Sequence, residues 1–460
     1  MMREKCGIFG VYGRRLEAAR LVHTGLWTLQ HRGQESSGIS VSDGKTIRTH
    51  KGPGLVSHVY DEATLSGLTG HMAVGHNRYS TSGGATFTHS QPVTTDRNLV
   101  ALVHNGNLPA VSRLVAYLES KGISTAEAND SELMHRAVEY HLAKGHSPES
   151  AVQECFDLFT GVFSLLLMTR NAVVAVRDAH GIRPLSLGRM NDGVVFSSET
   201  CAIDAAGGTF VRDIRPGELV VADDQGLRSS QLVDGEEKLD IFEFVYFARP
   251  DSVLLGKRVN EVRRNLGVNL AKEHPLNADV VIPVPDSAIP AALGYAGETG
   301  IKLDFGLVKN RYIHRTFIRP AQNLREGGVK LKLNPIPEVL KGRRVGVVDD
   351  SIVRGTTARQ IVEMLRRSGA QEVHFLVSSP PVRFPDFYGI DTPRPDELVA
   401  AGMSVEETRE FIGADSLAYL SYEGMIGATG LPESRFSTSC FSGAYPVDIG
   451  ENTIRQEIPR

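Results

Sequence analysis

One thirteen-residue stretch, V-G-V-V-D-D-S-I-V-R-G-T-T at residues 345–357, most constrains the fold of this chain. Its apolar start predicts a buried strand that ends in two adjacent carboxylates, Asp349 and Asp350. A short polar loop follows, and a predicted helix then runs through Arg367 and stops at Gly369. In a parallel sheet such a loop lies at the carboxyl end of the strand, where ligands bind. The stretch therefore predicts a mainly parallel α/β sheet with a ligand site at that edge.

The loop after the acid pair has the chemistry of a phosphate site. Backbone amides and a helix N-terminus favour an anion, Gly355 lets the backbone come close, and Ser351, Thr356 and Thr357 add hydroxyl donors. The two carboxylates suit ribose hydroxyls and a hydrated Mg²⁺ ion. If only the acid pair were present, it would be explained without any ligand, as a strand end with an acidic turn and an N-capping threonine. The complete string, however, resembles the phosphoribosyl diphosphate (PRPP) signature of type I phosphoribosyltransferases.

Two other segments are compatible with such a site. The V-P-D-S segment follows a predicted buried strand, and its tight turn, with Asp286 and Ser287, would present backbone amides to pyrophosphate. The basic segment K-N-R-Y-I-H-R-T-F-I-R-P-A-Q begins at Lys309 and includes Arg311. Taken alone, they read as a plain proline turn and a solvated basic loop. If a site for a highly anionic substrate lies nearby, the basic segment is better interpreted as a lid that closes over the substrate.

The length of 460 residues predicts two or three domains. A charged, turn-rich segment at residues 233–240 marks the predicted boundary. Upstream, many short strands and two helices indicate a sheet-on-sheet core with helices outside. Downstream, strands alternate with helices, as in a doubly wound sheet. The predicted helices are residues 16–30 and 131–143 upstream, and residues 258–271 and 289–296 downstream.

Cys6 lies in K-C-G-I-F-G, just before an apolar strand. A cysteine there is most simply an inert, small hydrophobic residue. The functional alternative is an N-terminal nucleophile. Removal of residues 1–5 would give Cys6 a free α-amine with a reference pKa of about 7.7–8.0. That amine can act as general base for the thiol without a histidine.

Further segments favour the nucleophile. G-H-N-R-Y-S-T offers Arg78 to a substrate α-carboxylate, and N-D-S-E offers Asp130 to an α-ammonium group. H-N-G-N-L offers the Asn105 side chain and the Gly106 amide as an oxyanion hole. The polar turn H-R-G-Q-E-S-S-G-I is suited to shape the pocket. In this order the fragments resemble the class II glutamine amidotransferase domain, in which Arg78 and Asp130 would hold glutamine with its amide facing Cys6.

A glutaminase half followed by a PRPP half resembles the glutamine phosphoribosylpyrophosphate amidotransferase family, over nearly the whole chain. The resemblance implies an α+β N-terminal-nucleophile αββα sandwich, followed by an α/β type I phosphoribosyltransferase domain with a mainly parallel sheet. The expected units are a leader at residues 1–5 that is removed on maturation, an amidotransferase domain at 6–235, a phosphoribosyltransferase domain at 236–445 and a C-terminal tail at 446–460.

The activity that the resemblance implies converts PRPP, glutamine and water into 5-phosphoribosylamine, glutamate and pyrophosphate, at the entry to de novo purine nucleotide synthesis. Ammonia would cross a dry internal passage between the two sites. Purine nucleotide effectors and a homo-oligomer, dimer or tetramer, are also expected. The family motifs assign PRPP to Asp286, Ser287, Lys309, Arg311, Asp349, Asp350, Ser351, Arg354, Gly355, Thr356 and Thr357. They assign Mg²⁺ to Ser287, Asp349 and Asp350.

One branch of the family holds a [4Fe–4S] cluster on four cysteines. This chain has Asp240, Asp386 and Ser437 at three of those positions, and only Cys440 remains. One thiolate cannot hold a cluster that takes four. We therefore predict that no iron–sulfur cluster is bound.

The composition indicates which partners the protein can bind and in which cellular compartment it is expected. A net charge of −4 argues against a broad nucleic-acid footprint. The four cysteines are too scattered for a disulfide framework, with Cys155 and Cys201 predicted as core residues, so a reducing, cytoplasmic location is expected. No apolar run approaches the roughly 20 residues of a membrane helix.

Two alternative functions remain open from the sequence. Another class II amidotransferase, such as hexosamine-phosphate synthase or asparagine synthetase, would share the first half but has no use for the acid-pair string. A nucleotide-sensing regulatory protein on an inactive amidotransferase scaffold would have lost a nucleophile, an oxyanion donor or the acid pair. All three groups are present.

Overall fold

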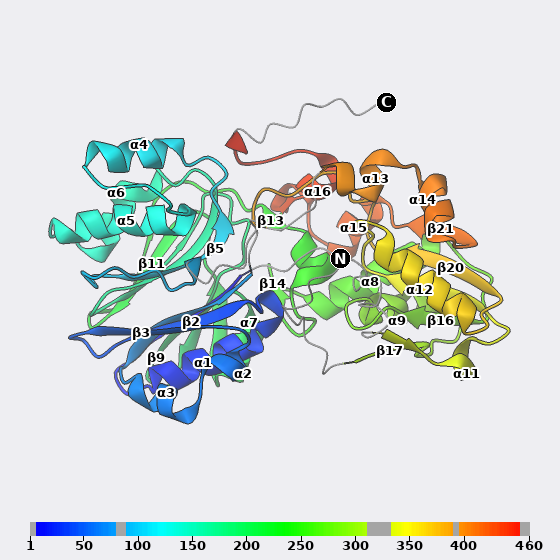
Figure 1. Cartoon of the computed structure of the whole chain (residues 1–460), viewed down its shortest axis with the longest axis horizontal. Helices are drawn as coiled ribbons and strands as arrows, with labels where there is room; N and C mark the ends of the chain where they lie inside the picture. The colour runs from blue at the N-terminus through cyan, green and yellow to red at the C-terminus, as the bar shows by residue number, and fades with distance from the viewer. Residues whose placement is uncertain (1–5, 80–88, 311–332, 390–394, 451–460) are drawn as a thin grey trace.

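The first half of the chain forms two antiparallel sheets that face each other (Figure 1). The computed structural model describes residues 6–79, 89–310, 333–389 and 395–450. The seven-stranded sheet has the order β10 (Thr209–Asp213), β8 (Ser186–Met190), β9 (Gly193–Ser197), β1 (Gly7–Tyr12), β4 (Met72–Arg78), β2 (Ser36–Ser42), β3 (Ile47–Pro53). The five-stranded sheet has the order β12 (Gly226–Gln231), β11 (Glu218–Asp223), β7 (Val173–Arg177), β6 (Val162–Met168), β5 (Ala101–Asn107).

Apolar side chains on the inner faces of the two sheets make the central core of this half. Ile8 and Val74 from the first sheet pack with Val103, Leu166 and Ala175 from the second, and each is fully buried. Successive strand residues point to opposite faces, so the other apolar positions pack against helices. This four-layer arrangement confirms the predicted αββα sandwich.

Helices cover the outer faces of both sheets (Figure 1). The seven-stranded sheet is covered by α1 (Ala18–Thr28), α2 (Val56–Val59), α3 (Glu62–Gly67) and α7 (Thr200–Ala205). The five-stranded sheet is covered by α4 (Ser112–Ser120), α5 (Asp130–Ala143) and α6 (Pro148–Phe156). The two predicted helices correspond to α1 and α5, and the expectation of only two was wrong. The signal for α6 is its start, where Ser147 caps the helix and Pro148 takes the first turn.

The second half is built on a parallel sheet of the order β16 (Val280–Pro283), β19 (Arg344–Asp349), β20 (Glu372–Val377), β21 (Ser416–Tyr419). One face packs against α8 (Val259–Glu273), α9 (Ile289–Thr299) and α15 (Tyr422–Thr429). The other face packs against α12 (Thr356–Arg367) and α14 (Val405–Ile412). Helices on both faces of a parallel sheet confirm the predicted α/β architecture.

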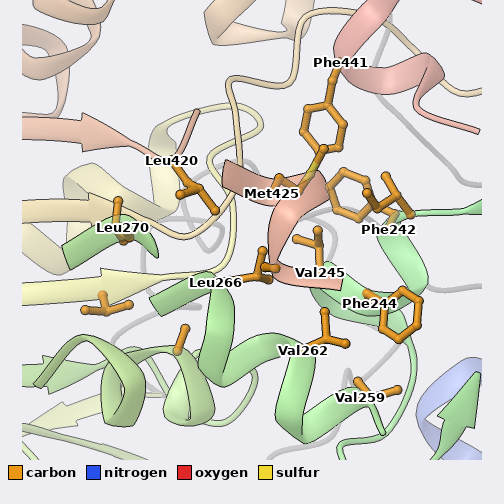
Figure 2. Close-up of a cluster of buried hydrophobic side chains, with 14 of the residues drawn as sticks. Phe242, Phe244, Val245, Val259, Val262, Leu266, Leu270, Leu420, Met425 and Phe441 are labelled. Atoms are coloured by element: carbon orange, nitrogen blue, oxygen red, sulfur yellow. The ribbon is translucent and has the colours of Figure 1, made fainter. Parts of the chain in front are cut away.

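The core on the α8 side also joins this sheet to the segment that follows the first half. Figure 2 shows Phe242, Phe244 and Val245 beside Leu266 of α8 and Met425 of α15. The remaining elements are short: β13 (Leu239–Asp240), a π-helical turn (Glu243–Phe247), β14 (Val253–Leu254), β15 (Lys257–Arg258), β17 (Leu307–Lys309), β18 (Leu333–Pro335), α11 (Pro337–Leu340), α13 (Val399–Gly402), β22 (Phe436–Ser437), α16 (Ser439–Ser442), and 3₁₀ turns Gln30–Arg32, Pro395–Glu397 and Glu433–Arg435.

The change between the two cores falls near the expected domain boundary. Val233 packs against the five-stranded sheet and its helices, whereas Leu239 belongs to the core of the second half. Near the other end, Val447 and Ile449 pack on Val162 of the first half; residues 451–460 of the expected tail lie outside the described residues. Within the part of the chain that the structure describes, no helix has the length and apolar character needed to cross a membrane.

Candidate active sites

Cys6 lies at the mouth of the first site because β1 pairs with β4. The register places Gly7 opposite Asn77, so Cys6 comes level with Arg78 at the end of β4. The Cys6 thiol lies 3.8 Å from the Tyr79 carbonyl oxygen, a weak sulfur contact. The pairing of these two neighbouring strands thus brings the predicted nucleophile next to the predicted carboxylate-binding arginine.

The surroundings of Cys6 keep its thiol protonated. Burial is the main cause that raises the pKa of the thiol. The positive charge of Arg78 opposes this shift, and the carboxylates of Glu35 and Asp130 add to it. A protonated thiol attacks an amide only when a base removes its proton, which is the task expected of the freed α-amine.

The predicted oxyanion hole comes from β5 in the facing sheet. Asn105 is buried, and its Nδ2 atom has no hydrogen-bond partner among the described residues. A buried amide donor without a partner is costly, which is accounted for if a substrate oxygen completes its hydrogen bond. Gly106 adopts φ +151°, and a Cβ atom there would lie 2.0 Å from the Val162 carbonyl oxygen. Only glycine fits that position.

Asp130 begins α5 and is held rigidly. Asn129 caps the helix and Glu132 bonds back to the Asn129 amide, which forms a capping box. The two Asp130 oxygens accept from the amides of Ser131, at 2.7 Å, and Leu108, at 3.1 Å. The second of these bonds links Asp130 to the segment just after the oxyanion strand. Arg78 and Asp130 both act electrostatically on Cys6, and Asp130 binds the amide of Leu108, which directly follows β5. Through these contacts the predicted residues on both sheets are linked to the start of α5.

Replacing Asn105 with alanine should lower glutamine-dependent turnover by about 10²–10³, the usual cost of one oxyanion donor. Ammonia-dependent turnover should not change, because ammonia bypasses the first site. Steady-state rates with each nitrogen source check this result. An equal loss of both rates would mean that Asn105 supports the fold and not the oxyanion.

The second site is a pocket at the carboxyl ends of β16 and β19. The loop from Ser351 to Thr357 forms one wall and the turn after β16 forms the other. Gly355 has φ +72°, and α12 starts directly after it, so the helix N-terminus opens toward the loop. A Cβ atom on Gly355 would lie 2.9 Å from the Phe411 ring. The lining residues are Val284, Pro285, Ser287, Asp349, Asp350, Ser351, Ile352, Val353, Arg354, Gly355, Thr356, Thr357 and Ala358.

The acid pair is buried at the floor of this pocket. Burial and the charge of Asp350 raise the pKa of Asp349 well above its usual range. Burial also raises the pKa of Asp350, while hydrogen bonds from Ser287 and Ser351 and the charge of Arg263 oppose that shift. Two crowded carboxylates that resist full ionisation favour a cation as partner.

The oxygens present fit a partly hydrated divalent cation. Ser287 Oγ donates to Asp350, which places the third predicted Mg²⁺ position beside the acid pair. No cluster of three or more His, Cys, Asp or Glu side chains suited to a metal occurs among the described residues. Mg²⁺ commonly takes one or two carboxylates and completes its shell with waters and substrate phosphates. Two carboxylates and a hydroxyl match that demand.

The remaining predicted PRPP residues are placed less directly. Lys309, on β17, forms an ion pair with Asp286 at 3.0 Å, so the two predicted residues bind each other. Arg354 lines the pocket and pairs with Glu397 at 2.6 Å. Arg311 and the rest of the expected lid lie outside the described residues.

At the positions of the family's cluster, the structure has a different arrangement. Arg183 Nη1 lies 2.8 Å from Asp240 Oδ2, and Arg183 Nη2 lies 3.6 Å from Asp386 Oδ1. Ser437 pairs with Asp240 across β13 and β22, and the Cys440 thiol lies 4.0 Å from Asp386 Oδ2. A guanidinium between carboxylates, with one thiol, does not fit a cubane on four thiolates.

A group of buried charges lies beside Cys6, and its ion pairs were not predicted, although Arg32 belongs to the turn that was expected to shape the pocket. Arg32 binds Glu199 and Glu243, which follow it by 167 and 211 residues. The available signal was local: a lone glutamate within the aromatic run F-E-F-V-Y-F, and an arginine in the glycine-rich turn after Gln30. Charged residues in otherwise apolar segments are almost never fully buried unless they are paired.

Comparison with known proteins agrees with this geometry. Residues 76–205 match the family model for the glutamine amidotransferase domain. The amidophosphoribosyltransferase of Mycobacterium tuberculosis is 46% identical, over 98% of this chain and 88% of its own length. A solved structure of glutamine PRPP amidotransferase from B. subtilis, in complex with ADP and GMP, is similar with a TM-score of 0.90 and 42% identity, over 98% of this chain and 99% of that chain. A second solved structure, described as the allosteric regulatory enzyme of purine biosynthesis, is similar with a TM-score of 0.91 and 43% sequence identity, over 98% of this chain and 98% of that chain.

The likeness at this level of identity spans both halves, and with them both candidate sites. The chain belongs to the amidophosphoribosyltransferase family.

Proposed function

We propose that this chain transfers ammonia from glutamine to C1 of PRPP, with glutamate, 5-phosphoribosylamine and pyrophosphate as products, at the entry to purine nucleotide synthesis. The observation that carries the proposal is the presence of two candidate sites in one chain. One site has a cysteine just before β1 and, on β5 of the facing sheet, a buried amide donor without a partner among the described residues. The other has a buried acid pair under an anion-binding loop.

In the first site, the chemistry starts at the Cys6 thiol. The freed α-amine takes the thiol proton, and the sulfur attacks the amide carbon of glutamine. Arg78 and Asp130 hold the carboxylate and the ammonium group of glutamine, while Asn105 Nδ2 and the Gly106 amide bind the oxyanion. The C–N bond breaks, ammonia leaves, and water then releases glutamate from the thioester.

In the second site, ammonia attacks C1 of PRPP as the bond to pyrophosphate breaks. The loop of Ser351–Thr357 and the start of α12 bind the 5-phosphate. Ser287, Asp349 and Asp350 would hold Mg²⁺, and the bound ion would supply positive charge that stabilises the pyrophosphate leaving group. Lys309 and Asp286 lie at the edge of this site, and Lys309 is free to exchange its carboxylate partner for a phosphate oxygen.

Further parts of the proposal follow from the family. Residues 1–5 form a leader whose removal exposes the amine of Cys6, and units 6–235 and 236–445 carry one site each, followed by the segment 446–460. The enzyme works in the cytoplasm as a homo-oligomer, dimer or tetramer. Purine nucleotides regulate it, in line with the ADP and GMP complex of the B. subtilis relative. No iron–sulfur cluster takes part.

A paired assay tests the proposal. Purified protein is given PRPP, Mg²⁺ and either glutamine or ammonia, and pyrophosphate release is measured. Release with both nitrogen sources is expected, together with an intact mass that shows Cys6 as the first residue. A nucleotide-sensing scaffold would release pyrophosphate with neither. Full glutamine use by protein that still carries the leader would overturn the role given to the α-amine.

A further inference from the structure

A chain of buried charges connects the nucleophile to the second half of the molecule. Arg32 Nε donates to the carbonyl oxygen of Cys6 at 3.3 Å. Its two terminal nitrogens bind both oxygens of Glu243, at 3.0 and 2.7 Å, and Nη1 also binds Glu199 at 2.6 Å. All three charged side chains are at most 1% exposed.

This arrangement uses the shape of the guanidinium as well as its charge. A planar fork can bind a carboxylate through two parallel bonds and still donate through Nε. Burying an arginine and two glutamates is costly unless each charge is well paired. Burial opposes the ionised form of Glu199, yet His31 and Arg32 hold the pKa of Glu199 well below its usual range. This environment therefore favours the ionised form of Glu199.

Both carboxylates are fixed by the second half. Glu243 starts the π-helical turn Glu243–Phe247. Arg263 of α8 binds the carbonyl oxygens of Phe244, at 2.7 Å, and Ala248, at 2.8 Å, and so holds that turn. Glu199 accepts from the Ser252 hydroxyl and the Arg249 amide, which also belong to the second half.

The second half also contacts the oxyanion strand. Asn107 Nδ2 donates to the Phe387 carbonyl oxygen at 2.8 Å. Gly389 has φ +103°, and a Cβ atom there would lie 2.9 Å from the Gly106 carbonyl oxygen. The first site is therefore supported from the second half on two sides.

We infer that Arg32 and Glu243 are positioning residues for the glutaminase nucleophile. Glu243, from the second half, orients the Arg32 guanidinium, and Arg32 fixes the Cys6 carbonyl. A fixed carbonyl sets the backbone of Cys6, and with it the directions of the α-amine and the thiol relative to Asn105. The inference rests on the proposed function and deepens it, because it makes the glutaminase site depend on a side chain of the other half.

The test replaces Glu243 with glutamine, which keeps the shape and removes the charge. Glutamine-dependent kcat should fall by roughly 10–100-fold, since small displacements at a reacting centre have effects of that order. KM for glutamine and ammonia-dependent turnover should stay near wild type, because Arg78, Asp130 and the second site are unchanged. Intact mass confirms that the leader is removed equally in each protein.

A matched control is Glu237→Gln. Glu237 pairs with Arg177, another buried arginine, at 3.0 Å, without contact to Cys6. This variant should keep the wild-type ratio of glutamine-dependent to ammonia-dependent rates. If Glu243→Gln fails to fold, Glu243→Asp retains the charge with a shorter reach, and the same selective loss is expected from it.

An unchanged ratio of the two rates, or an equal loss of both, in the Glu243 variant that folds would show a merely structural ion pair and overturn the inference. The proposed function fails in a different way. In that case the wild-type protein itself would release no pyrophosphate from PRPP with either nitrogen source.

Discussion

Replacing Cys6 with alanine should lower glutamine-dependent pyrophosphate release by roughly 10⁴-fold or more, the order seen when a covalent nucleophile is removed. Ammonia-dependent release should stay close to wild type. The thioester cannot form without the sulfur, whereas the PRPP pocket shares no residue with the first site. Rates with each nitrogen source, at saturating PRPP, give both values from one preparation.

The fold should tolerate this change. The Cys6 thiol has one weak contact, 3.8 Å from the Tyr79 carbonyl oxygen. Cys155→Ala is the matched control, because Cys155 lies on α6 and is fully buried in the core between the five-stranded sheet and its helices. It should lose roughly 1–2 kcal/mol of unfolding free energy and keep both activities. If Cys6→Ala loses ammonia-dependent activity as well, the division into two separate sites is wrong.

Local patterns were sufficient to predict which segments line the pocket of the second half. The acid pair, Gly355 and the hydroxyls that follow lie within one strand–loop–helix unit, and such a unit has few ways to fold. The order of strand, loop and helix was therefore predictable from thirteen residues, whereas the helix begins at Thr356, inside the loop that was expected to run to Thr357. The first site was predicted from four separate fragments, which the pairing of β1 with β4 and the facing β5 bring together.

Long-range partners could not be predicted in this way. No local rule pairs Arg32 with Glu199 and Glu243, which lie 167 and 211 residues away. Arg183 lies in the string R-D-A-H-G-I-R-P-L, and no local pattern there predicts that its side chain is buried between Asp240 and Asp386. Such contacts depend on how the halves pack, and hydrophobic periodicity carries no information on that packing.

These long-range contacts form a chain of ion pairs at the junction between the two halves. From Glu199 through Arg32, Glu243 and Arg183 to Asp240, anionic and cationic side chains alternate within hydrogen-bonding or ion-pair distance. Each charge has a partner of opposite sign, which is the condition under which buried charges are tolerated. At the junction these directional bonds add to apolar packing, in which Val162 and Ile182 form a cluster with Tyr388.

Replacing Asp349 with asparagine should remove glutamine-dependent and ammonia-dependent activity together, by about 100-fold or more, because both reactions end at the PRPP site. If Asp349 and Asp350 hold Mg²⁺ as proposed, loss of one of the two charges weakens a contribution typically worth several kcal/mol to such transition states. Pyrophosphate release is measured over a range of Mg²⁺ concentrations. Asp279→Asn is the control. The Asp279 carboxylate pairs with Arg344 at the amino ends of β16 and β19, whereas the pocket lies at the carboxyl ends of these strands.

Although Asp349→Asn should lose activity, its stability without ligands should be equal to or higher than that of wild type at neutral pH. Burial and Asp350 raise the pKa of Asp349, so the folded state binds this proton more tightly than the unfolded state. The free energy of unfolding that Asp349 contributes is therefore greatest at low pH and falls as pH rises toward the raised pKa. Asparagine removes this penalty and can still accept the Asp350 amide hydrogen bond, 2.9 Å long in the wild type. At neutral pH the Tm of Asp349→Asn should equal or exceed that of wild type, and the difference should shrink near the unfolded pKa of about 3.9. A large drop in Tm would mean that Asp349 supports the fold, and the loss of activity would then say nothing about Mg²⁺ or PRPP.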